Sequence, residues 1–393
     1  MPYLDYAASA PLRAEALAAM LPLLERPAAN PSSQHGPGRA ARTAVEAARE
    51  QVAALVGAAP GEVLFTSGGT EADNLAVKGT VLARPEGARQ LVCSAVEHHA
   101  VLDAAAWAEA DAGARVALAP VGPDGRVDLG RLAALLEPGR TALVAVMAAN
   151  NEVGTGQPVA AAAALAHAAG ALVLCDAVQA AGLPGVDVGR DGIDLLALAA
   201  HKLGGPTGVG ALVVRPGTAL RPLLHGGGQE RGVRSGTLPA AAIAGFGAAA
   251  AAALAEREAA GFAATLAGLR DRLLAGLRAL EPDLVVNGDP TGAGGLPGLL
   301  SVRFPGRRAE DLLLLLDRHG VACSAGSACA SGAVTPSHVL VAMGRGAAAA
   351  RETVRFSLGH ASTAAEVDAA VAAVAEALRV LGRRPLVDRE AAG

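Results

Sequence analysis

The sequence predicts an α/β fold built on a mostly parallel sheet. Short apolar or β-branched runs alternate with longer alanine-rich stretches of helical pattern, which is typical of parallel strands joined by helical crossovers. Most of the strand-like runs are apolar throughout, as expected of strands buried on both faces. The length of 393 residues exceeds one ordinary domain and suits two domains that share a large core.

The elements follow in order along the first two thirds of the chain. Seven strands are predicted, at Val63–Thr66, Leu91–Ala95, Val116–Ala119, Ala142–Met147, Ala171–Asp176, Leu195–Ala199 and Gly210–Val214. Helices are predicted around them, at Arg39–Val56, Glu71–Leu82, Ala100–Ala110, Leu129–Leu136 and Val159–Ala168. Together these segments predict a large domain at residues 15–255.

The pattern changes after residue 238. Residues 239–280 have the pattern of one or two long helices without a strand, which suits a bridge out of the large domain. Fewer elements follow, with strands near Leu284–Asn287, Leu299–Phe304 and Thr353–Leu358 and helices near Ala309–His319, Ser337–Met343 and Thr363–Leu381. We expect residues 1–14 and 256–393 to form a smaller α+β domain.

Composition excludes several classes of function. A net charge of −4 gives no electrostatic reason to bind nucleic acid. No apolar run free of charge and glycine is long enough to span a bilayer, and the first residues lack the layout of a signal peptide, so we expect no membrane contact. Cys93, Cys175, Cys323 and Cys329 are too few for a disulfide scaffold and lack metal-ligand spacing. We expect a cytoplasmic protein with reduced thiols and no metal.

A glycine-containing turn at residues 67–71, Ser-Gly-Gly-Thr-Glu, follows one predicted strand and opens a helix. The free amides of a helix N-terminus attract phosphate, and glycine lets the backbone approach it closely. Gly69 and Thr70 are therefore candidate phosphate ligands. The same turn is also explained as an ordinary strand–helix connection in which Thr70 caps the helix.

Asp176 ends an apolar predicted strand, the position at which α/β sheets bind ligands. It can cap a helix there. It can also face the ring nitrogen of a pyridoxal cofactor, which needs an anion to stay protonated and act as an electron sink. Gln179 would then hydrogen-bond the phenolate of the same cofactor.

Lys202 comes directly after the apolar run Leu195–Ala199 in a chain whose basic residues are otherwise almost all arginines. The only other lysine, Lys78, lies late in an amphipathic helix, which indicates a surface position. A surface role explains Lys202 poorly. A Schiff-base lysine, whose amine must lose its proton to react, explains it well.

Two further polar groups follow predicted strands. Glu97-His98-His99 offers an imidazole that can stack on a ring or move protons. Asn150 and Asn151 offer side-chain amides for hydrogen bonds. Each group also has a purely structural explanation.

Six motifs of the chain are Tyr3–Ala8, Asn30–His35, Thr66–Asn74, Asn150–Gly154, His201–Lys202 and Gly226–Thr237. In this order, and over almost the whole chain, they resemble the motifs of the class V aminotransferase-type enzymes. Within that group they resemble most the cysteine desulfurases that feed iron–sulfur cluster assembly and tRNA thiolation.

The resemblance implies fold type I of the pyridoxal 5'-phosphate enzymes and a homodimer with its sites at the subunit interface. It implies that Lys202 carries the cofactor and that Asp176 meets the pyridine nitrogen. Gln179 would then meet the phenolate while His98 stacks on the ring. It places the remaining ligands at the phosphate, with Thr70 and His201 from one chain and Thr237 from the partner chain.

The resemblance also implies how the substrate L-cysteine is held. Asn151 and Arg355 would bind its carboxylate, and the fork of an arginine matches a carboxylate bidentately. One position departs from the family pattern, because a hydroxyl residue usually stands three before the lysine and here the residue is Ala199.

The likeness to desulfurases in particular rests on residues 324–332, where small residues flank Cys329 on both sides. Such a run predicts a mobile loop rather than packed core. The resemblance implies that Lys202 or His98 removes the α-proton. Cys329 would then take the sulfur as a persulfide and pass it to an acceptor protein.

Two alternatives stay open from the sequence. One is another pyridoxal-dependent carbon–sulfur or carbon–selenium lyase, such as selenocysteine lyase, which needs no enzyme thiol. The other is a non-catalytic sulfur-transfer scaffold, against which the joint presence of Lys202, Asp176, Arg355 and Cys329 argues.

Overall fold

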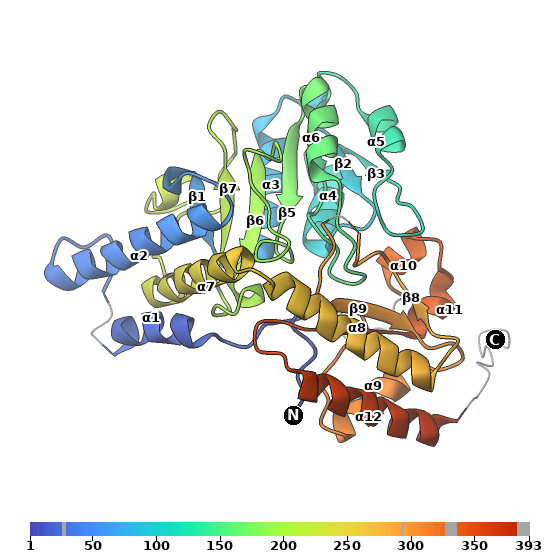
Figure 1. Cartoon of the computed structure of the whole chain (residues 1–393). Helices are drawn as coiled ribbons and strands as arrows, with labels where there is room; N and C mark the ends of the chain where they lie inside the picture. Colours follow the sequence, from blue (N-terminus) through green and yellow to red (C-terminus); the bar gives the residue numbers. More distant parts are fainter. Residues whose placement is uncertain (26–28, 293, 327–335, 383–393) are drawn as a thin grey trace.

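The computed structural model describes residues 1–25, 29–292, 294–326 and 336–382 (Figure 1). Its larger sheet has seven strands in the order β1-β7-β6-β5-β4-β2-β3. Their bounds are β1 Val63–Thr66, β2 Gln90–Ser94, β3 Arg115–Ala119, β4 Thr141–Ala145, β5 Leu172–Asp176, β6 Leu195–Ala199 and β7 Gly210–Val214.

The larger sheet is mostly parallel. From β6 across to β3 every pair of neighbours is parallel, whereas β7 pairs antiparallel with both β6 and β1. The predicted seven-stranded, mostly parallel sheet of an α/β protein is confirmed.

Helices cover both faces of this sheet. One face shares a core with α2 (Gly36–Leu55), α6 (Val159–Ala168) and α7 (Ala240–Glu258). The other shares a core with α3 (Gly69–Ala83) and α4 (His99–Ala112). Successive strand residues alternate between the two cores, as the period of two along a β-strand requires. The central strands are therefore buried on both sides, which explains their continuous apolar sequence.

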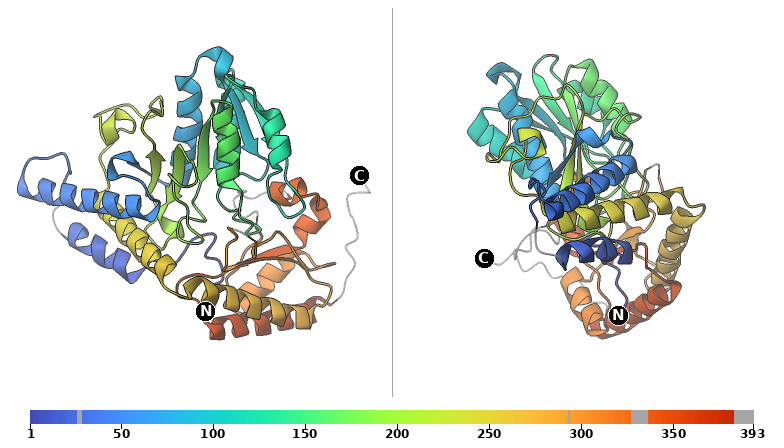
Figure 2. Two further views of the ribbon diagram at one scale, coloured as in Figure 1. Left: turned by 45° about the horizontal axis from the view of Figure 1, so that its top comes forward. Right: turned by 90° about the vertical axis from the view of Figure 1, so that its left-hand side faces the viewer.

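A second, three-stranded antiparallel sheet lies below the larger one and has its own core (Figure 2). Its strands are β8 Val285–Val286, β9 Leu299–Arg303 and β10 Thr353–Ser357. Its helices are α8 Phe262–Leu280, α9 Ala309–Arg318 and α12 Ala364–Leu381. Leu4 of the N-terminal segment is part of this core. The division at residues 15–255 stays a prediction.

Several helices differ from the sequence expectation. The long helical stretch is two helices, α7 and α8, and α2 begins at Gly36 because the His35 ring caps it, accepting a hydrogen bond from the Gly38 amide at 3.2 Å. Three of the described helices are short, with bounds α5 Leu129–Leu135, α10 His338–Ala342 and α11 Gly346–Arg351. Neither α11 nor α1 (Ala14–Leu24) was predicted. Helix α1 is apolar at almost every position and contains Pro22, so its sequence lacks the separate apolar and polar faces that predict a helix.

Helix α7 is, within the described ranges, the one helix long and apolar enough to cross a membrane by length and composition alone. It packs against α1 and α2 and contributes Ile243 and Phe246 to the core beside the sheet. The core helix of a globular protein has the same composition, so this feature is weak evidence for a membrane segment.

Gly210 of β7 lies where a side chain has no room. A Cβ there would be 2.5 Å from the carbonyl oxygen of Leu198 and 2.6 Å from the carbonyl carbon of Gly68. Backbone atoms cannot move aside as a flexible side chain can, so Gly210→Ala should destabilise the protein by about 1–3 kcal/mol. Calorimetry should show a lower Tm. Gly61→Ala is the matched control, since a Cβ at Gly61 meets nothing within 4 Å, and equal Tm values for both variants would contradict the close approach.

Candidate active site

A lysine and a carboxylate follow neighbouring strands at one edge of the large sheet. Asp176 is the last residue of β5, and Lys202 closes a 3-10 turn, Ala200–Lys202, directly after β6. Strands β5 and β6 are parallel, with Asp176 opposite Ala197. The carboxyl ends of parallel strands meet at one edge, where α/β sheets bind ligands. The two side chains therefore belong to one site.

The N-terminal segment holds the amine of Lys202. Its Nζ donates hydrogen bonds to the carbonyl oxygens of Ala7 at 2.5 Å and Ala8 at 2.8 Å. The side-chain amide of Gln179 donates to the same Ala7 oxygen at 2.8 Å. The structure therefore places Lys202 and Gln179 side by side under one backbone segment.

Lys78 lies outside this group. Its Nζ is 4.6 Å from the centroid of the Trp107 ring, a cation–π contact between α3 and α4. Of the two lysines, only Lys202 lies at the carboxyl edge of the sheet.

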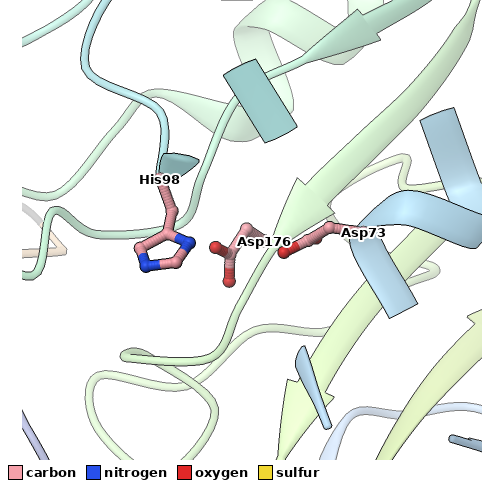
Figure 3. A group of neighbouring side chains, drawn as sticks. All are labelled: Asp73, His98 and Asp176. Atoms are coloured by element: carbon pink, nitrogen blue, oxygen red, sulfur yellow. The ribbon is translucent and has the colours of Figure 1, made fainter. Parts of the chain in front are cut away.

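His98, Asp176 and Asp73 form a compact group at the same edge (Figure 3). Each offers one polar atom, and these atoms all lie within 4.8 Å of one another. His98 caps α4, since its Nδ1 accepts a hydrogen bond from the Ala100 amide at 3.1 Å. Asp176 accepts one from the Val178 amide at 2.9 Å. Asp73 comes from α3 and was not singled out from the sequence.

Burial controls the charges here. It raises the pKa of Asp176, while the nearby His98, the Val178 amide and Lys202 lower it. Burial raises the pKa of Asp73 well above its usual range, and the charges of Asp176 and Glu97 raise it further. Burial likewise raises the pKa of Glu97 to about 8. These three carboxyl groups cannot all be ionised near neutral pH, because too little positive charge faces them.

His201 is neutral at physiological pH. Burial and then the charge of Lys202 lower the pKa of its imidazole to about 4. Its Nδ1 lies 3.4 Å from the Ser9 hydroxyl. A neutral ring beside a lysine can donate one hydrogen bond to an anion without adding a second charge.

The turn before α3 forms an amide-rich corner. A Cβ on Gly69 would lie 2.8 Å from the Val178 Cγ2 and 3.6 Å from the Ala199 Cβ. Thr70 in the first turn of α3 is exposed. The corner therefore brings Gly69 next to Ala199, the position where the family pattern has a hydroxyl, and it presents helix N-terminal amides suited to an anion.

Arg355 is a buried residue of β10. It contacts the N-terminal segment at Asp5, whereas Lys202 contacts it at Ala7 and Ala8. The Nη1 of Arg355 donates to the Asn151 carbonyl oxygen at 2.8 Å. Its Nη2 donates to Asp5 at 3.0 Å and to the Ser324 hydroxyl at 2.7 Å. Within the described residues its Nε has no hydrogen-bond partner. The structure therefore brings Asn151 and Arg355 together and leaves the arginine with a buried donor to satisfy.

Two predicted residues are not tested by these contacts. Thr237 is exposed, and the cofactor phosphate that it is predicted to bind would lie in the partner subunit. Cys329 lies outside the described residues. Cys323, by contrast, is half-buried, and burial raises the pKa of its thiol to about 12. It lies between two isolated bridges, at Ala322 and Ser324, rather than in a regular strand.

Sequence reasoning missed Asp73 and Asp5 as members of the site. Both lie inside motifs that carry the family resemblance. Asp73 is 1 % exposed, but an acid within a helical pattern ordinarily indicates a solvated face, and only the packing of α3 reveals its burial.

Residues 2–370 match the family described as aminotransferase class-V. The chain belongs to this family. Among its relatives, an IscS-like cysteine desulfurase of Mycobacterium tuberculosis is 46% identical over 377 residues, 94% of each chain. A cysteine desulfurase of Cereibacter sphaeroides is 48% identical over 367 residues, 93% of this chain and 92% of that one.

Solved structures agree with this family membership. A NifS-like protein has a TM-score of 0.88 and 35% identity, over 96% of this chain and 99% of the other. A structure described as SspA in complex with cysteine has a TM-score of 0.79 and 33% identity, over 91% of this chain and 99% of that one. This class V aminotransferase family member therefore has the predicted fold type I. The two relatives from Mycobacterium tuberculosis and Cereibacter sphaeroides are named cysteine desulfurases.

Proposed function

We propose that the protein is a pyridoxal-phosphate-dependent cysteine desulfurase. L-cysteine and the Cys329 thiol would give L-alanine and a Cys329 persulfide, a step in which the carbon–sulfur bond breaks and a sulfur–sulfur bond forms without an external oxidant. The observation that carries the proposal is the amine of Lys202, held at the end of β6 beside the buried carboxylate of Asp176.

The residues at the sheet edge fit the cofactor. Asp176 offers an anion for the ring nitrogen, and Gln179 offers an amide for the phenolate. When bound, pyridoxal phosphate supplies a Schiff base with the substrate amine and a protonated ring that stores electrons. The amides at the start of α3 suit its phosphate, and the partner chain's contribution through Thr237 completes the predicted set.

Lys202 and His98 are the groups that can move the α-proton. Lys202 Nζ must lose its proton before it can react with a carbonyl group or accept a proton from the substrate. The Ala7 and Ala8 carbonyl oxygens hold this amine at the edge of the sheet, where the cofactor and substrate would bind. The amine then accepts the proton, with His98 as the alternative acceptor.

Arg355 and Asn151 suit the substrate carboxylate. The partnerless Nε of Arg355 is buried, and leaving such a donor unsatisfied costs free energy that a bound carboxylate recovers. The interaction with Asp5 keeps the guanidinium in this orientation when no substrate is bound.

Cys329 is the thiol best suited to accept the sulfur. Burial raises the pKa of the Cys93 and Cys175 thiols, and burial likewise keeps Cys323 protonated. The thiolate is the nucleophile, so none of the three suits this role.

We further propose a cytoplasmic homodimer that passes sulfur to an acceptor protein. Leu12 and three leucines of α1, Leu17, Leu21 and Leu24, are 42–60% exposed in the single chain. Apolar surface gathered in this way is typical of a subunit contact. The names of the relatives support the substrate L-cysteine.

Ala199→Ser should tighten cofactor binding. The new hydroxyl would stand beside Gly69 in the phosphate corner, and a hydrogen bond to a charged group is worth about 1.5–3 kcal/mol, roughly ten- to a hundredfold in affinity. Titration of the apoprotein with pyridoxal phosphate measures this change. Ala197→Ser, two residues earlier on β6 and buried, is the control and should not tighten binding. Equal affinities for all three proteins would contradict the phosphate assignment.

Cys329→Ser and Cys323→Ser should behave differently. A serine oxygen is a poor sulfur acceptor, so Cys329→Ser should bind cofactor and cysteine but form little alanine and no persulfide. Cys323→Ser should lose some stability and keep turnover, because its protonated thiol packs as a small apolar group. Alanine and sulfide assays, with mass spectrometry of the persulfide, decide. An essential Cys323 beside a dispensable Cys329 would overturn the desulfurase mechanism, and alanine formed without either thiol would favour a simple lyase.

A further inference from the structure

Asp73 has no role in the proposed chemistry, yet it lies against its centre. The side chain comes from α3, is 1 % exposed, and has an Oδ1 atom without a hydrogen-bond partner among the residues that the structure describes. A buried carboxyl oxygen without a donor is costly if the group is charged. The side chain therefore needs either a proton or a cation.

The neighbour of Asp73 is the carboxylate that faces the cofactor ring. Figure 3 shows Asp176 between Asp73 and His98, and the polar atoms of the three side chains lie within 4.8 Å of one another. A carboxyl group that keeps its proton is a hydrogen-bond donor, and a neighbouring carboxylate is its natural acceptor once the two oxygens come within about 3 Å.

The surrounding charges decide which of the two acids keeps the proton. His98 and Lys202 face Asp176 and favour its ionised form. His98 also lies within 4.8 Å of Asp73, but the charges that act on Asp73, those of Asp176 and Glu97, both disfavour its ionised form. The buried thiol of Cys175 lies nearby. The proton therefore belongs on Asp73, and the negative charge belongs on Asp176.

We propose that Asp73 is a positioning residue that stays protonated and donates a hydrogen bond to Asp176, which keeps Asp176 ionised and oriented toward the cofactor ring. This proposal rests on the proposed function for the identity of the ring. Because Asp73 would act through a proton rather than a charge, an asparagine amide should be able to take over its role. An alanine, which has no hydrogen-bond donor in its side chain, should not.

The first measurement uses the cofactor and compares three variants. Asp73→Asn keeps a donor at the same place, so its affinity for pyridoxal phosphate and the pH at which the bound cofactor's visible band titrates should match the unsubstituted protein. Asp73→Ala lets Asp176 take up a proton more easily. Its affinity should fall about tenfold, the size of one hydrogen bond to a charged group, and the titration should shift. Thr80→Val is the control and should leave both readouts unchanged, because Thr80 is also buried on α3 and its hydroxyl has no hydrogen-bond partner among the described residues.

The second measurement uses the apoprotein and needs no cofactor. A buried acid whose folded pKa is raised loses stability as pH rises above its unfolded value of about 4. Asp73→Asn removes that loss, so its Tm should exceed that of the unsubstituted protein by a margin that grows between about pH 5 and 8. Thr80→Val should shift Tm equally at every pH.

The outcomes separate the two proposals. A margin that does not grow with pH would show that Asp73 is not a buried neutral acid and would overturn the inference. The inference would also be overturned if Asp73→Asn weakened cofactor binding as much as Asp73→Ala does. The site would then need the negative charge of Asp73, for example to bind a divalent cation. Failure of the unsubstituted protein to bind pyridoxal phosphate contradicts the proposed function and the role at the ring, whereas the apoprotein Tm still decides whether Asp73 is neutral.

Discussion

The N-terminal segment is the constraint on which the site depends. Residues 3–13 lie between the two sheets, bridging to Ala322 and Ser357 on one side and contacting the Lys202 turn on the other. The carbonyls of Ala7 and Ala8 fix the lysine amine, while Asp5 fixes Arg355. A bidentate ion pair of Arg13 with Glu256 of α7, at 2.7 and 2.6 Å, anchors the far end. This one segment, which turns at residues 6–8, thus connects the groups proposed for cofactor and substrate.

The second constraint is electrostatic. Three buried carboxyl groups, Asp73, Glu97 and Asp176, lie at the edge of the sheet. The groups that favour an ionised carboxylate there are Lys202 and His98, and both act on Asp176. Such a site is stable only when most of its acids are protonated. The proposed cofactor, with a protonated ring, would add the missing positive charge beside Asp176. The cofactor and the protonation states of the protein are therefore coupled.

Much of this could be predicted from sequence, for physical reasons that differ between elements. Strands β4 to β6 are apolar throughout because helices cover both faces, so their ends, and with them Asp176 and Lys202, were located within a residue or two. Helix α1 escaped prediction because its sequence is apolar at almost every position and lacks separate apolar and polar faces. The burial of Asp73 and the capture of Arg355 by Asp5 are long-range contacts that no local pattern encodes. Asp5 and Asp73 lie inside the family motifs, but the motifs do not indicate which residues these two acids contact.

The central claim is that the amine held by Ala7 and Ala8 is the one that carries the cofactor. Borohydride reduction of the protein with pyridoxal phosphate, followed by proteolysis and mass spectrometry of the labelled peptide, tests it directly. The chain has only two lysines, Lys78 and Lys202, so the result is unambiguous. The account predicts the reduced pyridoxyl group on Lys202 alone. A label on Lys78, whose amine lies against Trp107, would contradict it.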